Sequence, residues 1–230
     1  MADVVLVHGT TQSSAGFDGV QKALGNRAVR SFAVDIPGAG APTSAAYAEL
    51  LAAQVPDDFH RPIIVAHSAS GLLLPALARR LDASHQVWFA AAVGDYAGGR
   101  SLLAEIQADP TAVLHAEWIG VDPSSDPVLA TYFLFHDADL ATLRQAMPTV
   151  SSCDLSAIYA EVPTEDPARL PSTYVLPIED RTLQGHWMAS VAQDRLRGEL
   201  IRVHGSHNFY VADPEQAADI ISAAAGQAET

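Results

Sequence analysis

The sequence contains one cysteine, Cys153, and one lysine, Lys22, among its 230 residues. A single cysteine excludes an intramolecular disulfide, and it excludes metal sites built from several cysteines. Positive charge is also scarce, because 13 Lys and Arg residues stand against 27 Asp and Glu residues, which gives a formal net charge of −14. Such a field repels phosphate backbones and anionic lipid headgroups, so we expect neither nucleic acid nor a membrane surface as a partner.

Long apolar runs are missing as well. No run approaches the ~20 residues that cross a bilayer, and the longest, such as Val87–Val93, have the length of a strand. After Met1-Ala2-Asp3 the chain enters Val4–Val7, which is too short and too weakly flanked for the apolar part of a secretion signal. We therefore expect a cytoplasmic protein. Because 49% of the residues are hydrophobic and only 17% are charged, the chain can fill a large core.

Short apolar runs alternate with amphipathic stretches over the first 95 residues. The expected strands are Val4–Val7, Ala28–Val34, Ile63–Ala66 and Val87–Val93, and the expected helices are Phe17–Leu24, a segment from Thr43 or Ser44 to Val55, and Ser70–Leu81. Strands that are apolar on both faces and alternate with helices indicate a parallel sheet covered on both sides. Ligands of such sheets bind where the strands end, and the polar residues found there are His8, Asp35, Ser68 and Asp95.

The alternation stops after Gly98-Gly99 and resumes near residue 171. Between these points we expect only helical pieces, at Leu102–Gln107, Pro127–Phe135, Leu140–Met147 and Leu155–Tyr159. Beyond them we expect strands at Thr173–Leu176 and Glu199–Val203 and helices at Leu183–Asp194 and Pro214–Ala225. The sequence therefore predicts an α/β core at 1–97 and 171–230, with a mainly parallel sheet of about six strands, and a helical cap inserted at 98–170.

The segment Ile63–Gly71 reads as a strand, a turn of small residues and the start of a helix. A serine on such a sharp turn takes a strained backbone conformation, so the residues two before and two after it must be small. Ala66 and Ser70 meet that requirement, although neither is the glycine of the G-x-S-x-G pattern. Ser68 is therefore the candidate nucleophile, and the N–H of Ala69 at the helix start is a candidate donor to an oxyanion. The alternative is that Ser68 only caps the helix.

A serine hydroxyl needs a general base at neutral pH. His207 follows the last expected strand, so we expect it at the same sheet edge as Ser68, and His204 is the competing histidine. For the acid that orients the base, Glu179 and Asp180 follow the preceding strand, and Asp95 is a third candidate.

Two strings contain residue types that bind metals. His204-x-x-His207 has no suitable partner nearby, and in His136–Asp139 we expect Asp137 or Asp139 to cap the helix that starts at Leu140. We therefore expect no metal site.

Several of these segments together resemble the α/β-hydrolase fold: Val4–Thr10, Asp35–Gly38, Ala66–Gly71 and Gly205–His207. The short N-terminus is similar to that of the compact branch that holds plant-type methylesterases and hydroxynitrile lyases, together with bacterial esterases. The resemblance implies Asp180 as the acid, because in that fold the acid generally follows a short turn after the preceding strand, and the expected chain order of serine, acid and histidine agrees with His207 as the base. It also implies that the loop after His8-Gly9 supplies the second oxyanion donor, Thr10 or else Thr11, while His8 holds the loop by hydrogen bonds.

These features predict a serine hydrolase that needs no cofactor and cleaves a small or medium, largely apolar carboxylic ester. The same site could serve an acyltransferase, a lactonase or a cyclase. A hydroxynitrile lyase-like enzyme is disfavoured, because that branch usually has a lysine beside the catalytic histidine and a threonine in place of glycine, where this chain has Asn208 and Gly9. A binding protein without catalysis is the remaining alternative, since fold alone does not decide function.

Overall fold

The computed structural model describes residues 3–38 and 40–228. Residues 1–2, 39 and 229–230 lie outside this description. The predicted core segments 1–97 and 171–230 include these five residues. Six parallel strands form one sheet in the order β2-β1-β3-β4-β5-β6. They are β1 (Asp3–Val7), β2 (Arg30–Val34), β3 (Ile63–His67), β4 (His85–Phe89), β5 (Ser172–Pro177) and β6 (Glu199–Val203). The predicted α/β fold is confirmed.

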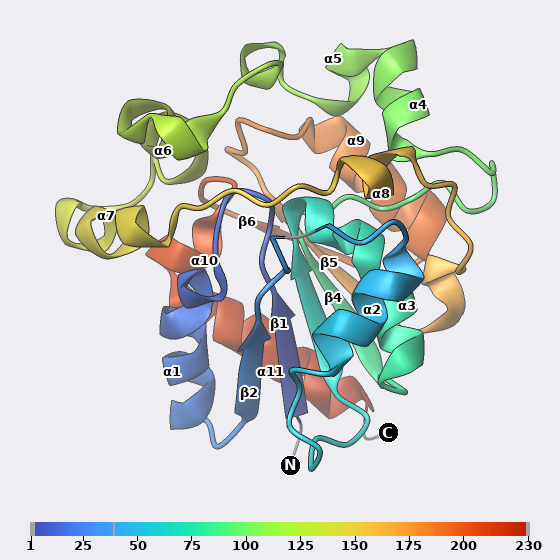
Figure 1. Ribbon diagram of the computed structural model, residues 1–230. Helices are drawn as coiled ribbons and strands as arrows, with labels where there is room; N and C mark the ends of the chain where they lie inside the picture. The colour runs from blue at the N-terminus through green and yellow to red at the C-terminus, as the bar shows by residue number, and fades with distance from the viewer. Residues whose placement is uncertain (1–2, 39, 229–230) are drawn as a thin grey trace.

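Helices cover both faces of the sheet, as the doubly apolar strands require (Figure 1). Val4 and Leu6 face a core that α1 (Asp18–Asn26), α10 (Phe209–Ala212) and α11 (Pro214–Ala228) complete. Val5 and Val7 face the opposite core, beneath α2 (Ser44–Ala52), α3 (Leu74–Arg80) and α9 (Gly185–Ser190). Within the described residues, none of these helices is both long enough and apolar enough to cross a bilayer.

The chain between β4 and β5 forms helices and no strand, and Figure 1 shows it running along the edge where the strands end. Its helices are α4 (Leu102–Ala108), α5 (Pro110–Val113), α6 (Pro127–Leu134), α7 (Leu140–Ala146) and α8 (Ser156–Ala160), with short 3-10 turns at Ala116–Trp118, Pro123–Ser125, Met147–Thr149 and Pro167–Arg169. Aspartates cap α5, α6 and α7, and a proline starts α5 and α6. All four predicted helical pieces agree with the structure to within a residue, and these local signals explain the agreement at α6 and α7, whereas α5 was not predicted.

Some predicted boundaries are wrong. The strand expected at Val87–Val93 begins earlier, with the buried polar residues His85 and Gln86, and ends before Ala90, whose φ is +41°. The helix expected from Ser70 starts as the 3-10 turn η2 (Ser68–Leu73). The helix expected at Leu183–Asp194 is α9 followed by a π-helical segment (Val191–Leu196), and a 3-10 turn (Ser14–Phe17) precedes α1.

Candidate active site

Ser68 lies at the corner between β3 and η2 with a φ of +58°, a region that residues other than glycine rarely occupy. Ser70 holds this corner, because its hydroxyl lies 3.1 Å from the Val7 carbonyl and 2.8 Å from the His67 carbonyl, and it accepts from the His67 N–H. Ser70 was predicted only as a small residue. Its position in the elbow motif was the signal for the two local bonds to His67, but the bond to Val7 depends on β1, which is distant in sequence.

The loop after β1 forms a turn, Gly9–Gln12, that the Gln12 N–H closes by donating to the Gly9 carbonyl. Thr10 and Thr11, the two candidate donors, occupy its middle. The turn lies directly on the elbow, because a Cβ added to Gly9 would be 2.9 Å from both His67 Nδ1 and Ser68 Cβ. The structure therefore brings the predicted oxyanion loop and the predicted nucleophile together.

His8 is buried, and its ring connects the loop after β1 to the chain after β2 by hydrogen bonds. Its Nε2 accepts a hydrogen bond from the Ile36 N–H (3.0 Å), which leaves Nδ1 to donate to the Gly9 carbonyl (2.8 Å). Burial lowers the pKa of His8, although the Gly9 carbonyl and the charge of Asp35 raise it. His8 therefore holds the loop by hydrogen bonds, as predicted.

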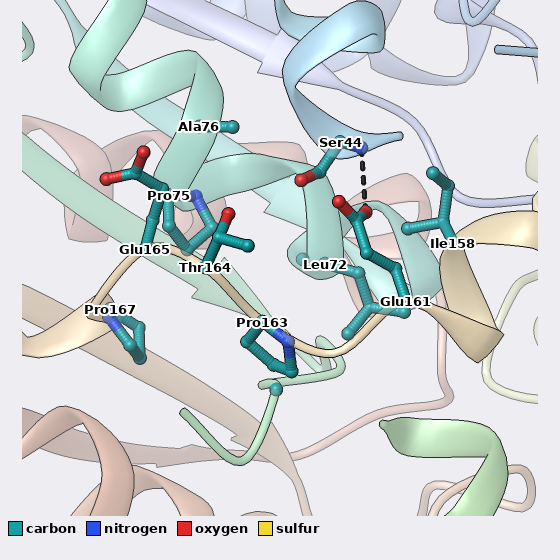
Figure 2. Close-up of a pocket in the computed structure, with 12 residues that line it drawn as sticks. Ser44, Leu72, Pro75, Ala76, Ile158, Glu161, Pro163, Thr164, Glu165 and Pro167 are labelled. Atoms are coloured by element: carbon teal, nitrogen blue, oxygen red, sulfur yellow. Dashed lines mark hydrogen bonds between the residues drawn. The ribbon is translucent and has the colours of Figure 1, made fainter. Parts of the chain in front are cut away.

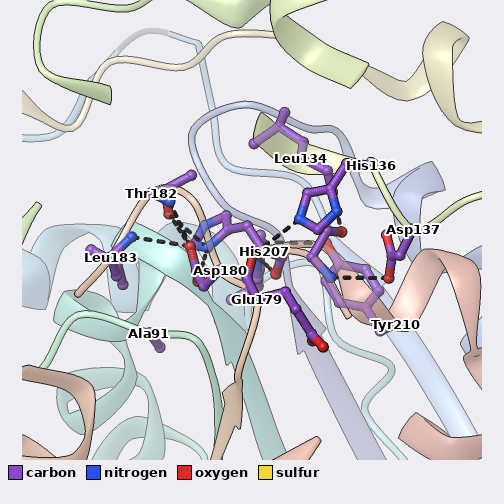
Figure 3. Close-up of polar contacts among 12 residues, drawn as sticks. Ala91, Leu134, His136, Asp137, Glu179, Asp180, Thr182, Leu183, His207 and Tyr210 are labelled. Atoms are coloured by element: carbon purple, nitrogen blue, oxygen red, sulfur yellow. Dashed lines mark hydrogen bonds and ion pairs between the residues drawn. The ribbon is translucent and has the colours of Figure 1, made fainter. Parts of the chain in front are cut away.

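His207 and Asp180 form a buried pair at the ends of β6 and β5 (Figure 3). His207 Nδ1 lies 2.7 Å from Asp180 Oδ2 and 2.8 Å from the Thr182 hydroxyl. Burial raises the pKa of Asp180, but the attraction of His207 and the hydrogen bonds from His207, Thr182 and Leu183 outweigh it, so the pKa lies below its ordinary value. The ionised carboxylate fixes Nδ1 and leaves Nε2 as the nitrogen for proton transfer.

The competing candidates have other partners. Glu179 accepts from His204 Nδ1 (2.9 Å) and from the Gly205 N–H (2.6 Å), so the alternative acid and the alternative base bind each other. Asp95 accepts from the Gly98 N–H (2.9 Å) in a tight turn. Neither carboxylate contacts His207 in the described part of the chain.

His67 connects the elbow to His207. Its Nε2 lies 3.2 Å from the His207 carbonyl, and the two rings are 4.6 Å apart. Burial, with repulsion from His207, keeps the pKa of His67 well below its ordinary value, so the ring stays neutral. Among the described residues no hydrogen bond joins the Ser68 hydroxyl to the His207 ring, and such bonds often tighten only when substrate binds.

The segment between β4 and β5 binds the oxyanion turn, the chain after Asp180 and the loop that contains His207. The amides of Ser151 and Cys153 donate to the Thr11 and Thr10 carbonyls. A bridge between Leu114 and Leu183 fixes the chain after Asp180. These contacts were not predicted, because each joins segments that are distant in sequence.

The end of α6 binds the loop that contains His207 (Figure 3). The Ser206 hydroxyl donates to the Leu134 carbonyl (2.6 Å), and the Ser206 N–H donates to Asp137 Oδ2 (3.0 Å). Of the two aspartates expected to cap α7, Asp139 does so through the Thr142 N–H, whereas Asp137 holds the base loop.

A separate small cavity lies between α3 and the chain that follows α8 (Figure 2). It is lined by Leu72, Pro75 and Pro163, and Glu161 accepts from the Ser44 N–H beside it. Its volume is about 30 Å³, which suits water rather than a substrate. Across residues 3–38 and 40–228, no three His, Cys, Asp or Glu side chains are arranged to hold a metal ion.

Comparisons with known proteins agree with this architecture. Polyneuridine aldehyde esterase superposes with a TM-score of 0.79 at 15% identity, over 97% of this chain and 98% of that one. Methylesterase MES16 from Arabidopsis gives 0.73 at 16% identity, over 98% and 99%. A pyrethroid hydrolase from Sphingobium faniae JZ-2 gives 0.74 at 17% identity, over 100% and 99%. A search of curated protein sequences finds no match. The profile of the alpha/beta hydrolase family matches residues 4–220, and the chain therefore belongs to that family.

Proposed function

We propose that the protein is a serine esterase that hydrolyses a small or medium, largely apolar carboxylic ester through an acyl-enzyme at Ser68. Membership of the hydrolase family makes the protein an enzyme of that general type. One observation carries the finer proposal: His207, oriented by the buried Asp180, packs against His67, the residue before the strained Ser68.

In the proposed cycle the Ser68 Oγ attacks the ester carbonyl carbon while His207 Nε2 accepts the hydroxyl proton. The N–H groups of Ala69 and of Thr10, or else Thr11, stabilise the negative oxygen of the tetrahedral intermediate. The carbon–oxygen bond to the alcohol then breaks, and His207 gives its proton to the leaving alkoxide. Water repeats the sequence on the acyl-enzyme, which releases the carboxylic acid and restores the Ser68 hydroxyl.

Three further considerations support an uncharged ester as the substrate. The printed names of the structural neighbours include an esterase, a methylesterase and a pyrethroid hydrolase. The net charge of −14 disfavours anionic substrates. Gly9 and Asn208 stand where a hydroxynitrile lyase-like enzyme usually has threonine and lysine, which favours hydrolysis over that lyase reaction.

Turnover of p-nitrophenyl acetate and butyrate tests this function. We expect Ser68→Ala and His207→Ala each to lower kcat/KM by about 10⁴-fold or more, because each removes a member of one catalytic unit. Ser190→Ala is the matched control, since that hydroxyl donates only to a carbonyl of its own helix, α9. Unchanged turnover in Ser68→Ala would overturn the acyl-enzyme mechanism.

Mass spectrometry after treatment with a serine-reactive phosphonate tests the nucleophile directly. The expected result is one adduct on the peptide that contains Ser68, and none in the His207→Ala variant. No turnover of any ester and no adduct, together with tight binding of an apolar ligand, would instead support a binding protein.

A further inference from the structure

The Gln12 side chain is almost completely buried, with 1% of its surface exposed, and within the described part of the chain its hydrogen bonds reach segments that are distant in sequence. Its Oε1 accepts from Asn208 Nδ2 (2.7 Å) and from the Tyr210 hydroxyl. Its Nε2 donates to the Thr149 hydroxyl (3.1 Å) in the insertion. One amide therefore joins the oxyanion turn, the chain just after His207 and the insertion.

The backbone of Gln12 is fixed as well. Its N–H closes the turn that contains Thr10 and Thr11, and Gln12 pairs with Val150 in an antiparallel bridge. Gly16 provides the space for the amide, because a Cβ at that position would lie 2.8 Å from the Gln12 amide atoms.

Asn208 is buried as completely as Gln12, with 0% of its surface exposed. Its Nδ2 donates to Gln12, so the contact between the oxyanion turn and the chain after His207 lies in the interior. The Tyr210 hydroxyl donates to Gln12 Oε1 and lies 3.3 Å from His67 Nδ1. It therefore extends the connection from Gln12 to the nucleophile elbow.

We infer that Gln12 is a positioning residue that sets the distance between the oxyanion turn and the His207 loop. The inference rests on the proposed function, because both elements must act on the same tetrahedral intermediate. The oxyanion turn and the His207 loop are far apart in sequence, since 196 positions separate Gln12 from Asn208. A buried contact between them fixes their relative position.

Gln12→Met keeps the length and volume of the side chain but removes its hydrogen bonds. We expect kcat for p-nitrophenyl acetate to fall about 10- to 100-fold while KM stays within about threefold, because a displaced donor weakens transition-state stabilisation more than substrate binding. Gln86→Met is the matched control: Gln86 is also 1% exposed, but it lies at the start of β4, at the opposite end of the strand from the site, and its amide donates to the Pro167 carbonyl. That variant should lose thermal stability and keep kcat within about twofold.

Amide hydrogen exchange separates this inference from the proposed function. Gln12→Met should accelerate exchange in both 9–13 and 206–211, whereas Gln86→Met should accelerate it in neither. Unchanged exchange in these segments would overturn the positioning role, as would an unchanged kcat or an equal loss of kcat in Gln86→Met. If wild-type protein neither turns over an ester nor reacts with the phosphonate, the proposed function fails, and the exchange result still decides whether Gln12 connects the two segments.

Discussion

Among single residues, glycines and other small side chains let segments of the chain pack closely around the candidate site. Gly71 lets η2 approach the end of β4, since a Cβ there would be 2.2 Å from the Ala92 carbonyl oxygen. The need for small side chains at Ala66 and Ser70 was predictable, because the steric cost of the turn is local. The bond from Ser70 to the Val7 carbonyl and the side-chain bonds of Gln12 were not, because those partners come from other strands and loops.

Gly9 provides a test at this scale. Its substitution by alanine places a Cβ against His67 and Ser68, so we expect a loss of about 1–3 kcal/mol in the free energy of unfolding and a large loss of esterase activity. Gly25→Ala is the control, because no atom lies within 4 Å of an added Cβ in α1, and alanine there should stabilise the helix by about 0.5–1 kcal/mol. Urea unfolding and p-nitrophenyl acetate turnover measure both effects. Full activity in Gly9→Ala would contradict the packing of the turn on the elbow.

Among the elements, the segment between β4 and β5 contacts the candidate site mainly through the chain that connects its helices. These connections hold the oxyanion turn, the chain after Asp180 and the base loop by hydrogen bonds. The helices α6 and α7 were predictable, because an aspartate before each of them and a proline at the start of α6 are local signals, whereas the four-residue α5 was not predicted. Their docking was not, because no periodicity in one segment specifies which loop it will contact.

The two aspartates before α7 separate a structural role from a role at the site. Asp137→Ala leaves the Ser206 N–H without its acceptor, and Asp139→Ala removes the helix cap on Thr142. Each variant should lose about 1 kcal/mol of stability. Only Asp137→Ala should also lower kcat, by several-fold or more, because only that residue holds the loop of His207. Steady-state kinetics beside urea unfolding measure the difference, and equal kcat values in the two variants would exclude a role for Asp137 at the site.

At the scale of the whole molecule, the fold was more predictable than the site. Doubly apolar strands such as Val4–Val7 determine a covered parallel sheet, and a parallel sheet brings its strand ends to one edge. The sequence therefore predicted that Ser68, His207 and Asp180 would gather there. The polar residues buried inside the core, such as His67 and His85, had no such pattern to reveal them, because their partners are fixed only when the core closes.

Those buried histidines determine how the molecule responds to acid. Burial lowers the pKa of His8, His67 and His85 below the ordinary value of 6.5. Below pH 6.5 the unfolded chain binds protons that the folded protein does not, so the free energy of unfolding should be highest above that pH and fall as the pH drops toward the lower folded values. Each such histidine contributes a slope of about 1.4 kcal/mol per pH unit in that window.

Urea unfolding at pH 7.5, 6.0 and 5.0 measures this slope. His85→Gln removes one of the titrating rings while keeping a polar group near the Thr173 hydroxyl, far from the proposed site, so it should flatten the slope by about 1.4 kcal/mol per pH unit. A slope that is the same in wild type and His85→Gln would mean that His85 is not held neutral by the fold. The depressed pKa of Asp180 acts separately: its contribution is present above the ordinary value of 3.8 and is lost only below it, outside the window of the histidines.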